Sequence, residues 1–175
     1  NVGPDLNGVR SHGRTHERCR VVAAVAAECR RHPVVVRRDE PRDDRDVIRR
    51  VRQAVFVVEQ SVPADLEWDG QDEACLHVLA ESSNRDVIGT GRLQPSGKIG
   101  RMAVLRPWRG IGVGSAILRA LIVAASELGI DEVYLHAQNR AVPFYDRFGF
   151  EAEGDEFMEA GIPHRLMRRR ARMDR

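Results

Sequence analysis

The sequence is short of long apolar runs, of paired cysteines and of net charge, and each shortage limits what the protein can be. Its longest apolar run, Val21–Ala27, holds seven valines and alanines between charged residues, whereas a membrane-spanning helix needs about 18. Glu28, Cys29 and Arg30 follow this run, where a secretory signal would carry small neutral residues before its cleavage site. We therefore expect neither a transmembrane protein nor an exported one.

Cysteine is scarce and its spacing forms no known framework. Cys19, Cys29 and Cys75 are odd in number and include no CxxC pair, which argues against a disulfide scaffold and against a closed zinc site. His12 and His16, which precede Cys19, have no clear fourth ligand and are interpreted as incidental. We expect a protein of the reducing cytoplasm that needs no metal.

Net charge is also small, at +2 from 28 basic and 26 acidic residues. Such a balance does not indicate a nucleic-acid binder. The arginine-rich end, Arg165 and Arg168–Arg175, lacks interleaved aromatic residues and is typical of a solvated tail. We expect no nucleic-acid or membrane partner.

The chain length of 175 residues and an apolar content of 42% fit one globular domain. Residues 1–33 mix glycine, arginine and histidine without a sustained period, and they predict an extension that is either flexible or one short helix near Glu17–Arg30. From Val34 the pattern changes to alternating strand-like and helix-like pieces. The predicted domain therefore spans 34–169, and 170–175 form a basic tail.

The predicted elements alternate in type, which indicates a mixed α/β fold with helices on the faces of a central sheet. Strands are expected at Pro33–Arg37, Ala74–Ala80, Val87–Leu93, Lys98–Leu105 and Val133–Ala137, and in three pieces at Phe150–Glu153, Glu156–Glu159 and His164–Arg168. Helices are expected from a cap at Asp43 or Asp44 through Phe56, from Ile111 to Leu128 before a Gly129 C-cap, and over Asn139–Phe148. The acidic segment Ser61–Glu73 is predicted as a loop.

The most informative segment is Val104–Ser115, in which a strand leads into a glycine-rich turn and then a helix. Backbone N–H groups at a helix N-terminus favour a phosphate or pyrophosphate, and Arg109 can add a charged contact. The glycine spacing by itself leaves tight helix–strand packing as an equal alternative. The segment lacks the Gly-Lys-Ser/Thr ending of a P-loop and also does not fit the dinucleotide fingerprint.

Two motifs resemble the GCN5-related N-acetyltransferases. Arg109-Gly110-Ile111-Gly112-Val113-Gly114 resembles the family's coenzyme A motif, Gln/Arg-x-x-Gly-x-Gly/Ala. Asn139–Phe150 resembles its second signature, an Asn followed by Ala and by Phe-Tyr-x-x-x-Gly-Phe. Arg52–Gln60 is similar to small bacterial members known only as predicted acyltransferases, and the resemblance covers about Val34–Arg169.

The resemblance implies a mostly antiparallel mixed sheet, with helices on both faces and a splayed parallel pair, Lys98–Leu105 and Val133–Ala137. Pantetheine would enter the gap like a further strand, pairing with backbone groups of Met102 and Val104. The pyrophosphate would lie against the glycine turn, and the thioester end against the second motif. The cofactor-binding residues implied in this way are Met102, Ala103, Val104, Arg109, Gly110, Ile111, Gly112, Val113, Gly114, Ser115, Asn139, Phe144 and Tyr145.

The implied activity is acetyl transfer from acetyl-CoA to a primary amine of a small molecule or a protein, directly within a ternary complex. Tyr145 resembles the family tyrosine that protonates the coenzyme A sulfur, and the Val104 N–H would hold the oxyanion. Cys75 is interpreted as a buried inert thiol rather than a nucleophile. The base that deprotonates the amine stays open among Glu59, Glu67, His77 and His136.

Two other functions are weighed against transfer: a non-catalytic acyl-CoA-binding or sensor module, and a nucleic-acid-binding protein, which the balanced charge disfavours. A non-catalytic acyl-CoA-binding or sensor module would retain the phosphate turn alone, and the complete glycine motif with Tyr145 argues against it. The acidic run Asp65–Glu73 suits a cationic amine substrate, but a solvated loop is the preferred interpretation. The acceptor, the acyl chain length and the oligomeric state, commonly dimeric in the family, stay open.

Overall fold

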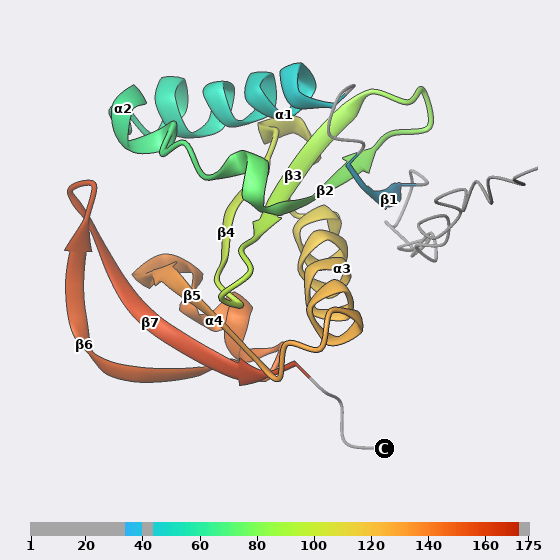
Figure 1. Ribbon diagram of the computed structural model, residues 1–175. Helices are drawn as coiled ribbons and strands as arrows, with labels where there is room; N and C mark the ends of the chain where they lie inside the picture. Colours follow the sequence, from blue (N-terminus) through green and yellow to red (C-terminus); the bar gives the residue numbers. More distant parts are fainter. Residues whose placement is uncertain (1–33, 40–43, 172–175) are drawn as a thin grey trace, which may run out of the picture.

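The computed structural model describes residues 34–39 and 44–171 (Figure 1). The predicted N-terminal extension, its helix near Glu17–Arg30, the His12–His16 pair, the Asp43 cap and residues 172–175 lie outside these ranges. Within them no helix is long and apolar enough to cross a membrane.

The strands form two antiparallel sheets. The first has the order β1-β2-β3-β4 and the second the order β5-β7-β6. Their bounds are β1 Val35–Arg38, β2 Leu76–Glu81, β3 Val87–Leu93, β4 Ile99–Val104, β5 Glu132–Gln138, β6 Glu151–Glu159 and β7 Ile162–Arg170. The three predicted C-terminal pieces are thus two long strands, because a bulge between Glu153 and Phe157 interrupts the pairing of β6 without ending it.

A parallel bridge joins the two sheets. Lys98, just before β4, pairs with Tyr134 of β5, whose N–H donates to the Gly97 carbonyl at 3.1 Å. Between Gly100 and Ala103, β4 holds one residue more than β3 does, and Arg101 takes a φ of +49° there. An extra residue bends a strand, and this bulge lies where β4 separates from β5. The predicted splayed parallel pair is confirmed.

Helices cover both faces of the first sheet (Figure 1). Helix α1 (Arg45–Arg52) continues into a π-helical segment, η1 (Gln53–Glu59), whose Val55 packs with Val51 of α1 against Ala103. The predicted helix is present, but it continues past Phe56 to Glu59, and its last turns are wider, with the Gln60 N–H donating to the Val55 carbonyl. The predicted loop after it contains two short turns, α2 (Ala64–Glu67) and η2 (Asp72–Ala74).

Helix α3 (Val113–Glu127) packs on the opposite face and connects β4 to β5. It lies so close to β3 that a β-carbon at Gly91 would be 2.8 Å from both Ile117 Cγ2 and Leu121 Cδ1. Gly129, with a φ of +75°, ends the helix as predicted. The β4-α3-β5 crossover therefore fixes the N-terminus of α3 at the open end of the gap between β4 and β5.

The remaining elements surround that gap. The turns η3 (Arg106–Trp108) and η4 (Asn139–Ala141) follow β4 and β5, and α4 (Val142–Asp146) follows η4. The β6–β7 hairpin curls away from α4 at the left of Figure 1. Strand β7 continues to Arg170, and Ala171 is buried, so part of the segment predicted as a basic tail belongs to the folded domain.

Candidate functional site

A cavity of about 1020 Å³ occupies the space between the diverging strands β4 and β5. The N-terminus of α3, the η1–α2 segment, α4 and the β6–β7 hairpin complete its walls. Of the predicted cofactor residues, those that line it are Met102, Val104, Arg109, Gly110, Gly112, Gly114, Ser115, Phe144 and Tyr145. Most of the predicted site thus comes together in one space.

Four predicted residues do not line the cavity. Ala103 and Val113 direct their side chains into the core, since alternate residues of β4 face opposite sides and Val113 lies on the buried face of α3. Ile111 packs against that core, and the Asn139 amide is exposed and donates to Glu156 on β6. Any role of Ala103, Ile111 and Val113 at the cavity is therefore confined to their backbone.

The start of α3 has the geometry of an anion site. Gly112 is the N-cap residue with a φ of +103°, and Gly110 has a φ of +77°, values that favour glycine. No side chain caps the helix, so the first-turn N–H groups that precede the Ala116-to-Gly112 hydrogen bond have no helical partner. A β-carbon at Gly110 would meet no atom within 4 Å. This bare turn opens into the cavity.

Arg109 is bidentate, as its motif predicts, but its partner is a protein carboxylate. Its two terminal nitrogens donate to Glu59 at 2.6 and 2.8 Å, while Nε donates to the Val104 carbonyl at 2.8 Å. The hydrogen bond from Arg109 lowers the pKa of Glu59. A carboxylate stabilised in its charged form is a weaker base, so Glu59 is a less suitable candidate for the base that deprotonates the amine.

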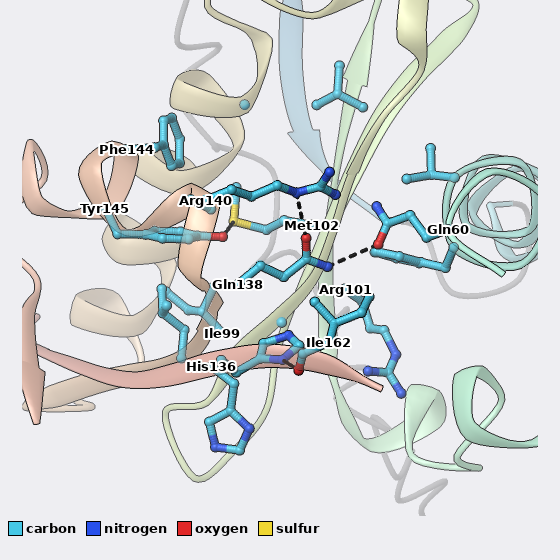
Figure 2. A pocket seen from close by; sticks show the side chains of 18 of the residues that line it. Gln60, Ile99, Arg101, Met102, His136, Gln138, Arg140, Phe144, Tyr145 and Ile162 are labelled. Atoms are coloured by element: carbon cyan, nitrogen blue, oxygen red, sulfur yellow. Dashed lines mark hydrogen bonds between the residues drawn. The ribbon is translucent and has the colours of Figure 1, made fainter. Parts of the chain in front are cut away.

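Tyr145 extends from α4 toward the middle of the cavity, where Figure 2 shows its hydroxyl against Met102. The hydroxyl donates to the Met102 sulfur at 3.8 Å. The ring packs edge-on against Phe144 and Phe150, with centroids 5.0 and 6.0 Å away. Burial raises the pKa of Tyr145 to about 12, so this phenol stays protonated at neutral pH.

A row of hydrogen-bonded polar side chains lies beside this contact (Figure 2). The Gln138 side chain on β5 donates to Gln60 at 3.0 Å and accepts from Arg140 Nε at 2.9 Å. Gln60 directly follows Glu59, so the end of η1 contacts both strands of the gap. Glu59 holds Arg109, in the turn that leaves β4, and Gln60 holds β5.

Two histidines lie on the hairpin side of the cavity. His136 on β5 has Nδ1 at 2.7 Å from Glu159 and 3.4 Å from the Lys98 ammonium. His164 on β7 directs Nδ1 at the Ile162 carbonyl, 2.7 Å away. Phe157 contacts both rings, edge-on to His136 and stacked on His164.

The acidic loop is neither a solvated segment nor an open amine site, because its carboxylates hold buried arginines. Arg52, with 0% of its side chain exposed, donates to Glu67 at 2.5 Å and to both Asp72 oxygens at 2.8 and 2.9 Å. Arg92 donates to Asp69 at 2.8 and 2.6 Å and also to Asp72. The preferred interpretation of this loop was therefore wrong.

Glu67 and His77, two predicted base candidates, both belong to this buried network. Glu67 is 2% exposed and reaches Arg52 and Arg101, although burial still raises its pKa. His77 contacts Asp39 and Asp72 and does not line the cavity. Its backbone N–H and its ring contact carboxylates of the buried network instead.

Cys75 has a pKa raised by burial, consistent with an inert thiol. Across 34–39 and 44–171, no group of three His, Cys, Asp or Glu side chains is arranged to hold a metal ion. Within the described residues, no cysteine is placed to act as a nucleophile at the cavity.

Sequence reasoning missed Gln60, Gln138, Arg101 and His164, all of which line the cavity. None belongs to a motif with a chemical signature. His164 lies two residues after Ile162 in a strand that follows a glycine turn. This spacing predicts that the two side chains share one face of the strand, but it does not predict that His164 lines the cavity.

Comparisons with known proteins agree with this geometry. Residues 39–171 match the family model described as an acetyltransferase (GNAT) domain. The uncharacterized N-acetyltransferase YjcF of Bacillus subtilis is 40% identical over 121 residues, covering 67% of this chain and 86% of its own.

Solved structures give the same result. An acyl-CoA N-acyltransferase from Pseudomonas aeruginosa is 31% identical, with a TM-score of 0.70 over 78% of this chain and 99% of that one. A GNAT family acetyltransferase from Elizabethkingia anophelis, solved with acetyl-CoA bound, is 14% identical with a TM-score of 0.61, covering 78% and 97% of the two chains. The second likeness concerns the fold alone.

Proposed function

The chain belongs to the GNAT acetyltransferase family, and from this premise we propose that it moves an acetyl group from acetyl-CoA directly to a primary amine in a ternary complex. Membership supports acyl transfer in general. The acetyl donor, the amine acceptor and the direct route are the proposal. The acceptor is a small-molecule amine or a protein amine, and the cysteine pattern favours action in the cytoplasm.

The observation that carries the proposal is the bare glycine turn at α3, which opens into the same cavity as Tyr145. Free N–H groups at a helix start favour a pyrophosphate. The Elizabethkingia anophelis protein of the same fold binds acetyl-CoA. In this chain the residues present fit the ligand, because positive φ at Gly110 and Gly112 exposes the amides without side chains.

The open edge of β4 suits the pantetheine arm. The Leu105 N–H donates to Ile88 on β3, so by alternation the Val104 N–H points away from β3 and toward the gap. The Val104 carbonyl already accepts from Arg109. The N–H of Val104 is thus the group left to stabilise a developing oxyanion.

Tyr145 is the proposed acid for the departing thiolate. Its raised pKa keeps it protonated, and its present partner, the Met102 thioether, is a weak acceptor. A thiolate would be a much stronger acceptor for the same proton. The phenol can therefore exchange partners without losing a strong hydrogen bond.

Calorimetry with acetyl-CoA tests the cofactor. We expect Gly112→Trp to weaken binding by about 100-fold or more, because the indole would fill the turn. Gly129→Trp is the matched control: it lies just beyond the other end of α3, with a φ of +75° and no atom within 4 Å of an added β-carbon. Its backbone strain is similar, so it should bind as the wild type does.

A free-thiol assay with a panel of primary amines then tests transfer. Thiol release that needs both an amine and an intact glycine turn supports the proposal. Binding without release for any amine would favour the acyl-CoA sensor instead. A wild-type chain that does not bind acetyl-CoA would overturn the proposal.

A further inference from the structure

His164 shares a sheet face with Gln138. The two residues are direct partners across β5 and β7, and three residues further along each strand in the ladder Leu135 pairs with Met167. Leu135 and Met167 are buried in the core. Because faces alternate along a strand, His164 and Gln138 lie together on the opposite face. That is the face on which Gln138 contacts Gln60.

This face lies beside Tyr145's hydroxyl. From the Lys98–Tyr134 bridge, β4 and β5 run in parallel and diverge around the cavity that Met102, Gln138 and Tyr145 line. Figure 2 shows the Gln138 side chain beside Met102 and the Tyr145 hydroxyl. His164, the neighbour of Gln138, therefore lies near the place where the sulfur, the phenol and the Val104 N–H would meet a thioester.

The hydrogen bond to Ile162 fixes which nitrogen of His164 can accept a proton. A carbonyl oxygen only accepts, so Nδ1 at 2.7 Å must donate to it. In the neutral ring the lone pair is then on Nε2. No side chain or backbone group of the described ranges bonds this nitrogen, and the ring lines the cavity with 8% of the residue exposed. Stacking on Phe157 holds its plane.

Most charged groups on this side of the cavity contact one another, and Glu159 also interacts electrostatically with His164. These charged groups are Glu159 on β6, His136 on β5, Lys98 and Arg101 at β4, and Glu67 on α2. Glu159 holds His136, and the hydrogen bond between them helps to lower the pKa of Glu159. Glu67 contacts Arg101. His136 precedes Gln138 by two residues on β5 and so lies nearer the closed end of the gap.

We propose that His164 is the base of the reaction, an assignment that rests on the proposed function. Nε2 takes one proton from the amine nitrogen as that nitrogen forms its bond to the acetyl carbon. The bond from this carbon to sulfur breaks, its electron pair stays on sulfur, and Tyr145 gives sulfur a proton. Solvent then takes the proton from His164 and returns one to Tyr145, so the products are the amide and the free thiol.

The variant His164→Asn removes the proposed base but keeps a side chain that can bond the Ile162 carbonyl. The Asn side-chain NH₂ can still donate to the Ile162 carbonyl, but nothing replaces the Nε2 lone pair. With the best amine from the thiol assay, we expect kcat to fall by about 10²-fold or more, while calorimetric binding of acetyl-CoA is unchanged. The wild-type profile of kcat against pH should show an acidic limb that this variant lacks.

His136→Asn is the matched control and should keep the acidic limb. If His136→Asn loses the limb and His164→Asn retains it, the assignment to His164 is overturned while the transferase stands. Unchanged kcat in His164→Asn overturns it equally. Failure of the wild type to bind acetyl-CoA removes the proposed function, and the base assignment with it.

Nitrogen NMR of the histidine rings tests the tautomer without any substrate. Long-range proton–nitrogen correlations at neutral pH should show His164 with hydrogen on Nδ1 and none on Nε2. Hydrogen on Nε2 would overturn the assignment whatever the kinetics show, because that nitrogen could then accept no proton.

Discussion

Removal of the buried Arg52 guanidinium should be among the most damaging single changes to this fold. Arg52 is fully buried and donates to four acceptors, including the Glu67 backbone carbonyl at 3.0 Å, and it lies 4.9 Å from the Trp68 ring. Together these bonds join α1 to α2 and η2. They therefore hold the segment that forms the α2 wall of the cavity.

The substitution Arg52→Met keeps helix propensity and most of the side-chain volume. It leaves the Glu67 carboxylate, 2% exposed, with Arg101 as its remaining charged partner. Asp72 also loses its two hydrogen bonds from Arg52. Breaking one partner from a buried pair costs about 3–5 kcal/mol. For a domain of this size that corresponds to a fall in Tm of roughly 10–20 °C.

Equilibrium urea unfolding followed by circular dichroism measures the loss. Arg45→Met is the control on the same helix, since the Arg45–Glu73 pair is exposed and should contribute less than about 1 kcal/mol. The double variant Arg52→Met with Glu67→Leu should recover about 1–3 kcal/mol relative to additivity, because no buried carboxylate is then left unpaired. A cost below about 1 kcal/mol for Arg52→Met, or strict additivity, would refute this reasoning.

Three further outcomes are expected. Gly91→Val should destabilise the fold by about 1–3 kcal/mol in urea, because its β-carbon meets α3 at 2.8 Å, whereas Gly100→Ala, with open space around it, should cost less than about 1 kcal/mol. The hydrogen bond from Arg92 lowers the pKa of Asp69 from 3.8 to about 2, so its stabilisation is present above about pH 4 and is lost as the pH falls toward about 2. Asp69→Asn should flatten that part of the stability–pH curve by about 1–2 kcal/mol, and an unchanged slope would contradict the pairing. Tyr145→Phe should lower kcat by about 10²-fold or more with unchanged acetyl-CoA binding, and wild-type turnover by this variant in the thiol assay would exclude the phenol as the acid.

Local sequence was sufficient for the parts of the site that one segment builds. The turn at Gly110 and Gly112 needs only a strand, positive φ and a following helix, all of which are contiguous. The end of α3 at Gly129 and the position of Tyr145 on a short helix follow from equally local signals. The structure of these three parts depends little on residues distant in the sequence.

Contacts between segments distant in the sequence could not be predicted from these local signals. The acidic loop has the pattern of a solvated segment because Arg52 and Arg92 lie up to 23 positions away and nothing in the sequence indicates that they turn inward. Asn139 matched a motif but faces Glu156 on β6. The bulge at Arg101 likewise depends on the register between β3 and β4.

The sequence by itself thus determined the fold class and the bare glycine turn at the start of α3, because apolar periodicity and glycine backbone freedom act over a few residues. Only the tertiary structure decided which carboxylates are buried, that Glu59 holds Arg109, and that His164 shares a cavity with Tyr145. These last two arrangements bring together residues 50 and 19 positions apart in the chain. Their energies depend on burial and strand register, which exist only after the chain has folded.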